Sequence, residues 1–575
     1  MAQYQTDLRD IYFNLFECLK VQDVWQEFEQ SDLRDIVDQY DKFVGSEVFP
    51  TRILSDSQGV HLEADGAKAP ACFKPLKQKF YENGWFGLGK PEEIGGMPAP
   101  HSLQIVTSSL SCGANVSFEM YIGLTRAALN VILKVGTDEQ RARYVEKIMT
   151  GDWGGTMCLT EPGAGSDVGA VGTTATPSGN GKYNIKGVKI FISSGESDLY
   201  ENNIHLVLAR TPGAPEGTKG LSLFIVPRFK IEPDGSLGKA NDVYCTKVEE
   251  KMGIHGSATC ELTFGQKGNC EGELIGKEFE GMANMFIMMN EARLMCGLQG
   301  ESQGNLAYML TLQYAKERMQ FGSEIYRMPD VKRMLLKMRC LGRGMRSLIL
   351  YTAHLFDLVE KGQTELESEI AFLTPICKAW CSEEGFNVSI EAIQVHGGYG
   401  YCTEYGIEQF ARDTKIATIY EGTNGIQAMD FTLRKNLKEN GATFQSVAGK
   451  IMRALATPEA QVWPQASALM GDCLQKGKSM MEKLGGYAAA KDMNRVLEHS
   501  MAFMQFSGNL IIGWRLLDAA IVASSKISSA STDDKKYYQS KIDDFIFYSQ
   551  HKLTQNIGLA HSVLNDQFSL NEVEL

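Results

Sequence analysis

The spacing of apolar residues changes twice along this chain, and the two changes restrict the folds open to it. Near residue 35 the spacing is helical, with Leu33, Ile36, Val37 and Tyr40 at i, i+3, i+4 and i+7. Between about 155 and 275, short segments alternate with period two and are separated by Gly, Asn and Pro turns. Helical spacing returns at about 280 and continues to the end. We therefore predict a mainly α-helical protein with a β-domain in its middle.

Two segments are typical of the predicted strands. Tyr183–Ile192 alternates polar and apolar side chains, and Leu221–Pro227 is a short apolar run that ends in Pro. No strand–helix–strand alternation occurs along the chain, which argues against a Rossmann domain.

Breaks in the pattern divide the chain into five expected segments. These are an N-terminal extension at 1–34, a helical domain at 35–153, a middle β-domain at 154–278, a helical bundle at 279–440 and an extra helical domain at 441–575. The last segment carries 13 Lys and Arg against 13 Asp and Glu, so it is locally neutral.

Composition narrows the function classes. Of 575 residues, 43% are apolar and 22% charged, as in an ordinary globular protein, and the net charge of −13 argues against a nucleic-acid-binding surface. The N-terminus shows no signal sequence, and no apolar stretch reaches the roughly 20 residues that span a bilayer. The 13 cysteines form no CxxC pair, and Cys377 and Cys381 lack a nearby His. We therefore expect a reducing compartment, the cytoplasm, and no metal site.

The run Glu161–Asp167 is rich in Gly and ends with a hydroxyl and a carboxylate. Glycines let a backbone approach a ligand closely, and Ser166 can hydrogen-bond a phosphate or carbonyl. No Gly-Lys-Ser/Thr follows, which excludes a Walker A loop, and no strand-to-helix unit surrounds it. Taken alone, such a run is more often a surface turn.

The run Tyr420–Asn424 places Glu421 between Tyr and Gly after an apolar helical stretch. In a dry pocket the pKa of this carboxyl would rise toward the range of about 6–7 that suits a general base. Taken alone, a solvated glutamate at a helix end is the more frequent interpretation.

Two further runs follow predicted helices. Gln394–Gly400 is rich in Gly, and its single His396 has no second His at metal-binding spacing. Arg318–Gly322 combines a cation with an aromatic residue, although Arg near a helix C-terminus is ordinary by itself.

Together these motifs resemble the acyl-CoA dehydrogenase family. The matching segments occur in order between about residues 35 and 435: Thr160–Ser166, Phe191–Ser193, Arg318–Phe321, Gln394–Gly398 and Glu421–Thr423, supported by Pro91–Gly96 and Lys251–Ser257. The aromatic-rich segment at 8–16 and the long tail resemble the extended branch that includes 3-methylmercaptopropionyl-CoA dehydrogenase.

The resemblance implies a fold and a cofactor. The fold would be a helical domain, a β-barrel-like domain and a four-helix bundle, here with an extra C-terminal helical domain, and FAD would lie between the middle domain and the bundle. Around the flavin the resemblance places Met157, Leu159, Thr160, Phe191 and Ser193, with Ser166 at the flavin edge or the acyl-CoA. For the FAD pyrophosphate and adenosine of a neighbouring subunit it suggests Arg318, Phe321, Gln394, Gly397 and Gly398; Thr423 and Gly425 complete the cofactor-binding set.

The resemblance also implies a reaction. Glu421 would take the α-proton of an acyl-CoA while a hydride leaves the β-carbon for flavin N5, giving a trans-2-enoyl-CoA. The backbone N–H of Glu421 and a ribityl hydroxyl of FAD would stabilise the developing enolate oxygen. The substrate-binding residues would be Ser166, Asn290, Arg293, Tyr420 and Gly422.

Two positions depart from the family pattern. Some members carry the catalytic Glu immediately before the arginine that corresponds to Arg293, where this chain has Ala292, so Glu421 is the only well-placed base. Glu291 would face about 100° away around the helix, and we interpret it as structural. Gly425 replaces the Gln of many members, so one side-chain contact to the cofactor is lost or replaced by backbone.

Four functions are compatible with these motifs to different degrees. We favour an acyl-CoA dehydrogenase of fatty-acid β-oxidation that passes electrons to an electron-transferring flavoprotein. An acyl-CoA oxidase using O2 would share almost all these residues. A DNA-associated flavoprotein of the alkylation-response type needs a basic C-terminal surface, and a non-catalytic acyl-CoA-binding protein would be expected to lack Glu421. Because a neighbouring subunit completes the implied site, we expect a homo-oligomer, a dimer rather than a tetramer; the acyl-chain length stays open.

Overall fold

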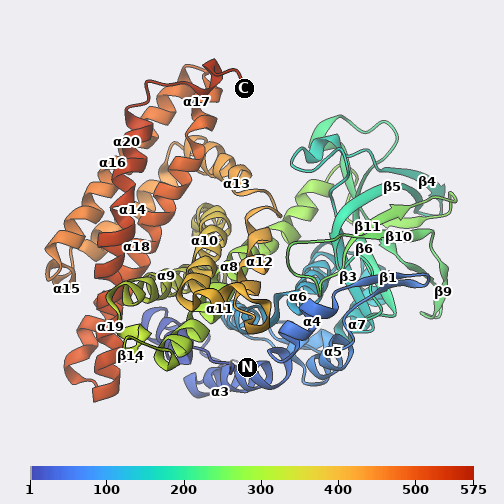
Figure 1. Ribbon diagram of the computed structural model, residues 1–575. Coiled ribbons are helices and arrows are strands. Elements are labelled where there is room, and N and C mark those ends of the chain that lie inside the picture. Colours follow the sequence, from blue (N-terminus) through green and yellow to red (C-terminus); the bar gives the residue numbers. More distant parts are fainter. Residues whose placement is uncertain (1–2) are drawn as a thin grey trace. The chain divides into compact units, whose positions relative to one another are not determined.

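The computed structural model describes residues 3–575, with only the backbone described at Asn290 and Asn571 (Figure 1). The chain groups into two compact units. The helical unit combines the N-terminal segment up to Lys42 with Pro100–Gly113 and Arg293–Leu575, and the mixed unit combines Phe43–Ala99 with Ala114–Ala292. The long helices α6 (His101–Val135) and α8 (Gly281–Glu317) each contribute residues to both units. Each unit therefore combines segments that lie apart in the sequence, and the division into five segments stays a prediction.

The expected β-domain is present in the mixed unit. Its eight-stranded sheet (teal to green in Figure 1) has the order β10-β11-β5-β12-β7-β6-β3, with β4 beside β5 and β6. Neighbouring strands are antiparallel except where β6 pairs with β3 and β4. The strands are β3 (Trp153–Cys158), β4 (Thr174–Gly179), β5 (Lys182–Ser193), β6 (Asn202–Arg210), β7 (Leu221–Pro227), β10 (Val243–Val248), β11 (Thr259–Phe264) and β12 (Glu271–Leu274).

Strand β5 departs from regular alternation near its end. Ile185, Lys189 and Ile192 are buried, whereas Phe191 is 59% exposed and has a φ of 57°. A register shift against β11 falls in the same stretch, between Cys260 and Leu262. Such a bulge turns side chains to new directions. It directs Phe191 outward and leaves a lysine in the interior.

Helices and a hairpin complete the mixed unit. They are α4 (Thr51–Gln58), α5 (Phe73–Glu82), the C-terminal part of α6, α7 (Asp138–Met149) and the hairpin β1 (His61–Glu63) and β2 (Gly66–Lys68), with the smaller pair β8 (Phe229–Ile231) and β9 (Leu237–Ala240). The helical pattern of residues 35–153 does not indicate the β1–β2 hairpin, since each strand has three residues. Helix α6 is kinked at Asn115, whose amide donates to Thr51 Oγ1 and Ser55 Oγ.

The bundle in the helical unit is built from α8, α9 (Pro329–Glu360) and α10 (Glu367–His396). Helices α8 and α10 cross with their backbones in contact, because a methyl group at Gly300 or Gly385 would overlap the backbone of the other helix. Larger residues would force the helices apart. The crossing brings the neighbouring side chains of α8 and α10 together.

The helices after residue 440 (orange to red in Figure 1) pack on this bundle. Gly508 of α18 fits against the Trp380 ring of α10, and the indole N–H of Trp380 donates to Asn509 Oδ1 at 2.9 Å. The principal helices are α14 (Ala442–Leu455), α16 (Pro464–Ala489), α18 (Ser500–Lys526), α19 (Thr532–Tyr548) and α20 (Gln555–Leu564). The expected fold, including an extra C-terminal helical domain, is confirmed.

Shorter elements connect these helices within the same unit. They are α1 (Leu8–Tyr12), the π-helix η1 (Phe13–Cys18), α2 (Val21–Val24), α3 (Gln30–Phe43), the hairpin β13 (Met319–Gln320) and β14 (Ser323–Glu324), α11 (Gly398–Tyr401), α12 (Glu408–Lys415), α13 (Asn424–Asp430), the π-helix η11 (Phe431–Leu437), α15 (Pro458–Gln461) and α17 (Met493–Glu498). Helix α3 covers the predicted helical run, and Leu33, Val37 and Tyr40 are its buried residues.

A buried carboxylate ties the N-terminal segment to the bundle and to the extra helices. Asp10 of α1 is fully buried and accepts from Arg346 of α9 at 2.9 Å and from the ammonium of Lys541 on α19. Burial alone would raise the pKa of Asp10, but the cations of Lys541, Arg343 and Arg346 lower it overall. The N-terminal extension is therefore an integral part of the helical unit.

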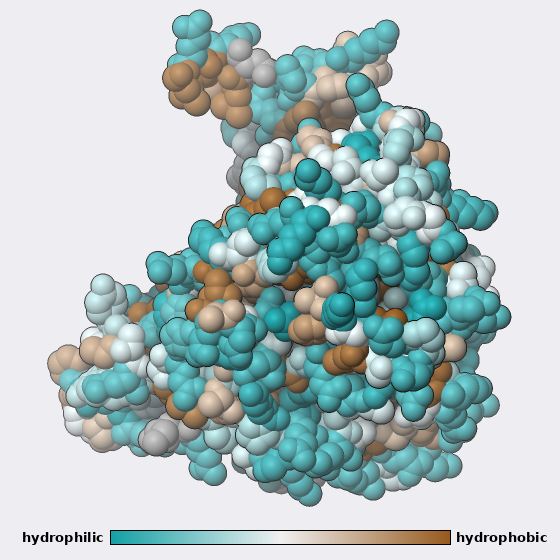
Figure 2. Space-filling model, turned by 90° about the vertical axis from the view of Figure 1, so that its right-hand side faces the viewer, coloured by the Kyte–Doolittle hydropathy of each residue, from teal (hydrophilic) through white to brown (hydrophobic). Residues whose placement is uncertain are grey.

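The surface and the longest apolar helix are ordinary for a protein of this composition. One face is mainly hydrophilic, with scattered apolar side chains (Figure 2). Among the described helices, α6 is the one long and apolar enough to cross a membrane, and 78% of its most apolar window is buried inside the protein. A helix in the core of a protein can be as long and as apolar as α6.

Candidate functional site

Glu421 lies in a loop whose backbone takes two left-handed residues in succession. Glu421 has a φ of 57° and Gly422 a φ of 82°. The loop then enters α13, where Thr423 Oγ1 caps the helix by accepting from the N–H of Ile426 at 3.2 Å. Gln427 closes the turn by donating to the Glu421 carbonyl at 3.0 Å. A left-handed non-glycine residue held by surrounding bonds is frequent at functional sites.

Burial raises the pKa of the half-buried Glu421 to about 7. The guanidinium of Arg293 and the ammonium of Lys378 oppose this rise. Lys378 Nζ donates to Asn424 Oδ1 and forms no ion pair with this carboxylate among the described residues. A carboxyl group with this pKa is half ionised near neutral pH, as a general base should be.

The neighbours of Glu421 come from two bundle helices. Arg293 and Cys296 lie on α8 and Lys378 on α10, and the pKa of each is affected by the Glu421 charge. The hydroxyl of Tyr420 donates to Gln299 of α8. The close crossing of α8 and α10 thus assembles the surroundings of the base.

The backbone N–H of Glu421 has no acceptor among the described residues. Backbone donors away from bulk water are nearly always paired. This N–H is therefore available to an oxygen of a bound ligand, next to the carboxylate of the same residue.

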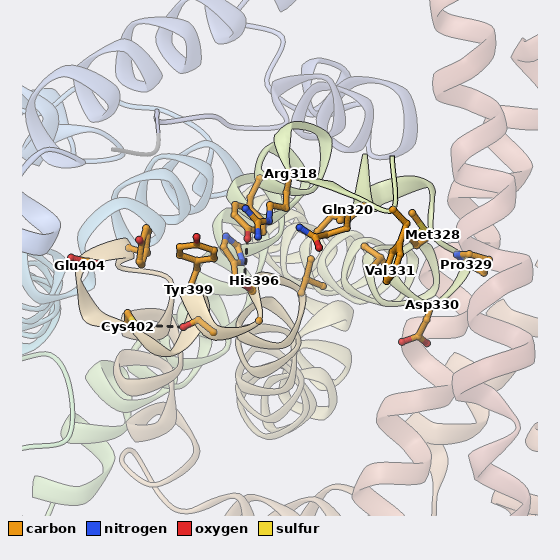
Figure 3. A pocket seen from close by; sticks show the side chains of 17 residues that line it. Arg318, Gln320, Met328, Pro329, Asp330, Val331, His396, Tyr399, Cys402 and Glu404 are labelled. Atoms are coloured by element: carbon orange, nitrogen blue, oxygen red, sulfur yellow. Dashed lines mark hydrogen bonds between the residues drawn. The ribbon is translucent and has the colours of Figure 1, made fainter. Parts of the chain in front are cut away.

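A cavity of about 890 Å3 lies elsewhere in the helical unit (Figure 3). Arg318 and Gln320 approach it from the segment after α8, while His396 approaches it from the end of α10 and Tyr399 and Cys402 from the segment that follows. The walls consist of Tyr314, Arg318, Gln320, Phe321, Ile325, Met328, Pro329, Asp330, Val331, Val395, His396, Gly397, Gly398, Tyr399, Cys402, Glu404 and Tyr405.

The cavity combines a cation, open backbone and aromatic rings. The Arg318 guanidinium lies 5.2 Å from the centre of the Tyr399 ring, and Tyr314 stacks on His396 with centroids 4.2 Å apart. Gly397 has a φ of 62°, and a side chain there would meet open space. Phe321 occupies the tip of the β13–β14 hairpin, where φ is 51°, and is 96% exposed. Burial lowers the pKa of His396, so this ring is neutral at physiological pH.

The predicted residues of the β-domain meet at the end of β3 and β5. The Thr160 carbonyl accepts from the N–H of Ile190 at 2.9 Å, which places Leu159 and Thr160 beside Phe191. Met157 lies in β3, and Ser193 is the last residue of β5, paired with Thr259 of β11. Ser166 is exposed in the loop after Glu161.

The remaining predicted residues are spread over both units. Gln394 is exposed on the last turn of α10 and does not line the cavity. Gly425 lies in the first turn of α13, with Thr423 Oγ1 as its nearest neighbour. The side chain of Asn290 lies outside the described part of the structure. Glu291 accepts from the Asn130 amide at 2.6 Å within the mixed unit.

Two buried lysines were missed by the sequence reasoning. Lys189 is fully buried in β5 and pairs with Glu161, and Lys378 is fully buried in α10 near Glu421. Each stands alone among apolar neighbours, in Val188–Ile190 and Ile376–Trp380. A single lysine inside an apolar run was the available signal.

The comparisons with known proteins cover nearly the whole chain. The N-terminal, middle and C-terminal domains of acyl-CoA dehydrogenases match residues 30–152, 156–266 and 280–434, and an acetyl-CoA dehydrogenase C-terminal-like domain matches residues 432–574. The chain belongs to the acyl-CoA dehydrogenase family and is an oxidoreductase.

Two relatives match over almost their full length. The chain is 35% identical to 3-methylmercaptopropionyl-CoA dehydrogenase of Ruegeria pomeroyi, covering 98% of each chain. It is also 35% identical to the broad-specificity linear acyl-CoA dehydrogenase FadE5 of Mycobacterium tuberculosis, covering 100% of each chain. A solved acyl-CoA dehydrogenase from Bacillus anthracis, described as complexed with FAD, shares the fold with a TM-score of 0.76 at 23% identity, over 95% of this chain and 90% of that one.

FAD is the cofactor of this family, and the cavity residues fit it. Arg318 supplies a positive charge and Gly397 and Gly398 supply unobstructed backbone, which suit a pyrophosphate. The rings of Tyr314, Phe321 and Tyr399 suit a flat heterocycle such as adenine. The cofactor predicted from the motifs is confirmed. In the part of the chain that the structure describes, no group of three or more His, Cys, Asp or Glu side chains could hold a metal ion.

Proposed function

We propose that this protein converts an acyl-CoA thioester to the trans-2-enoyl-CoA, with Glu421 as the base that removes the α-proton. The single observation that carries the proposal is the environment of Glu421. Burial raises the pKa of its carboxyl to about 7, while two nearby cations keep the ionised form accessible. A poised base with a strained backbone, in a chain of this family, is best explained by proton abstraction.

The same loop supplies an electrostatic contribution. Removing the α-proton places negative charge on the thioester oxygen, and that charge must be stabilised. The unpaired N–H of Glu421 is a fixed donor for this oxygen. A single donor of this kind contributes roughly 3–4 kcal/mol to a transition state. Tyr420 and Gly422 flank the base as substrate contacts, and Arg293 supports it from α8.

Bound FAD would supply the two-electron acceptor, its N5 taking the hydride that leaves the β-carbon as the new double bond forms. Arg318, Gly397 and Gly398 would hold the pyrophosphate, and Phe321 the adenosine, of the FAD bound to a neighbouring subunit. Leu159, Thr160, Phe191 and Ser193 would contact the flavin ring. The exposed Phe191 has a left-handed φ that only the surrounding strand maintains, which fits a ring-packing role.

The test compares two glutamate variants under anaerobic conditions. Glu421→Gln should keep bound yellow FAD and fail to bleach with acyl-CoA. Glu291→Gln, on α8 beside the alternative location of the base, should bleach like wild type. Near wild-type bleaching of Glu421→Gln would reject Glu421 as the base. Turnover across straight, branched and thioether acyl-CoAs then defines the substrate.

The electron acceptor is proposed to be an electron-transferring flavoprotein. The measurement is peroxide yield in air against reduction of that flavoprotein or a dye; stoichiometric peroxide would instead identify an oxidase. We also propose a homodimer, because Phe321 lines the cofactor cavity and is 96% exposed. A stable tetramer in sedimentation would contradict the dimer.

A further inference from the structure

Lys378 is a charged residue at a fully buried position, where an apolar side chain normally packs. It lies in the middle of α10, its exposed fraction is 0%, and no ion pair with a described carboxylate is formed. A buried ammonium without an anion in contact is unfavourable by several kcal/mol. A methionine of similar length would avoid this cost.

The ammonium is held by the loop that carries the base. Lys378 Nζ donates to Asn424 Oδ1 at 3.0 Å, and Ser382 Oγ donates to the same oxygen at 3.3 Å. The Asn424 amide nitrogen donates back to the Ala379 carbonyl at 3.1 Å and to Glu383 at 3.2 Å. The side-chain oxygen and nitrogen of Asn424 therefore both have hydrogen-bond partners. Asn424 lies three residues after Glu421.

The charges around Glu421 come from four elements. Arg293 and Cys296 lie on α8, Lys378 and Glu383 on α10, Asp430 on α13 and Arg434 on η11. Asp430 and Arg434 act on Arg293, and Asp430 also forms an ion pair with Arg434 at 3.1 Å. Lys378 is thus the second cation acting on the base, and burial lowers its own pKa to about 8.

We propose that Lys378 is a positioning residue for Glu421: through Asn424 it holds the loop of the base, and its buried ammonium favours the ionised carboxylate. The inference rests on the proposed role of Glu421 as the base. Arg293 alone would leave the carboxyl more often protonated at neutral pH. The buried ammonium of Lys378 would thereby keep the base ready to accept a proton.

The experiment separates the charge of Lys378 from its anchoring bond. Lys378→Gln keeps a donor for Asn424 and removes the charge, whereas Asn424→Ala keeps the charge and removes the acceptor. The rate of anaerobic flavin reduction by acyl-CoA is measured from pH 5 to 9. In the pH–rate profile, the acid limb is the range in which reduction slows because the base becomes protonated. Lys378→Gln should move this limb upward by about one pH unit. Asn424→Ala should slow reduction with the limb near its wild-type position.

Lys541→Met is the matched control, because Lys541 is a second buried lysine of the helical unit that does not act on Glu421. It should lower stability and leave the acid limb in place. If Lys378→Gln does not fold, Lys378→Met serves as the second charge-removing variant. If the acid limb lies at the same pH in wild type and in the charge-removing variant, the proposal is overturned.

A measurement without turnover keeps this inference distinct from the proposed function. The carboxylic acid stretching band of Glu421 is isolated as the infrared difference between each protein and its Glu421→Gln variant, and titrated. Loss of the Lys378 charge should raise the titration midpoint; an unchanged midpoint would overturn the proposal. If acyl-CoA bleaches the flavin of Glu421→Gln, this result rejects Glu421 as the base and does not bear on the titration midpoint.

Discussion

The ammonium of Lys189 lies 2.8 Å from the carboxylate of Glu161 and 3.0 Å from the carbonyl of Leu159. The same carboxylate accepts from the N–H groups of Gly172 at 2.8 Å and Thr173 at 3.0 Å. Burial alone would raise the pKa of Glu161, but Lys189 and these bonds lower it overall. One buried ion pair thus closes the loop that carries Thr160 and Ser166.

Lys189→Met should lower the free energy of unfolding by about 3–5 kcal/mol, because it leaves the Glu161 carboxylate without its cation. Lys186→Met is the matched control on the same strand, where the side chain is exposed, and should change stability by less than about 0.5 kcal/mol. Denaturant unfolding measures both. Similar losses for the two variants would show that the ion pair does not hold the loop.

Lys541→Met should destabilise the helical unit by about 1–3 kcal/mol, because the buried Asp10 loses one cation while Arg346 still contacts it. Lys536→Met, on the same helix, breaks only an exposed pair with Asp533 and should cost under about 1 kcal/mol. Limited proteolysis should show earlier cleavage within Thr532–Tyr548 in the first variant alone. Equal protection of both variants would argue against the Asp10 cluster as the anchor.

The Asp10 cluster also predicts a response to acid. The folded-state pKa of Asp10 lies below its unfolded value, so its contribution to stability is present above the unfolded pKa of about 3.9 and is lost as pH falls. Asp10→Asn should therefore be less stable than wild type at pH 7, with the difference shrinking below about pH 4. Urea unfolding at both pH values measures this, and a constant difference would contradict it.

Glu421 predicts the opposite pH dependence. Its folded pKa of about 7 lies above the value of an unfolded glutamate, so the folded state binds the proton more tightly. Stability is then lost as pH rises between about 4.5 and 7. Glu421→Gln should be more stable than wild type by roughly 2–3 kcal/mol at pH 8 and by much less at pH 5. Thermal unfolding of both proteins at the two pH values checks this prediction. The same stability difference at pH 5 and pH 8 would contradict a raised pKa for Glu421.

Gly422→Ala should slow flavin reduction and lower stability by about 1–2 kcal/mol, since φ is 82° and a methyl group would lie 2.7 Å from Gln427 Nε2. That nitrogen holds the Glu421 carbonyl, so the base would lose its support. Gly425→Ala, compared by unfolding only, meets its nearest atom at 3.6 Å within α13 and should be neutral or slightly stabilising. Equal destabilisation would indicate that the turn at Gly422 is not special.

The spacing of apolar residues along the sequence predicts most helices and strands, because apolar side chains are the ones that become buried. Helix α3 follows directly from a spacing of 3.6 residues, and strand β7 from a short run of apolar residues that is buried almost throughout. Strand β5 follows only in part, because a bulge near Cys260 of the neighbouring strand redirects Phe191. The β1–β2 hairpin is too short to produce a periodic pattern.

The sequence by itself determined the helix–sheet–helix order, the family-like motifs and Glu421 as the candidate base. Only the tertiary structure decided which charges act on that base. Arg293, Lys378 and Glu421 lie far apart in sequence and come together where α8 and α10 cross at Gly300 and Gly385. The pKa of Glu421 follows from burial and from those two cations. Such terms depend on distances through space, and residue spacing along the chain does not specify them.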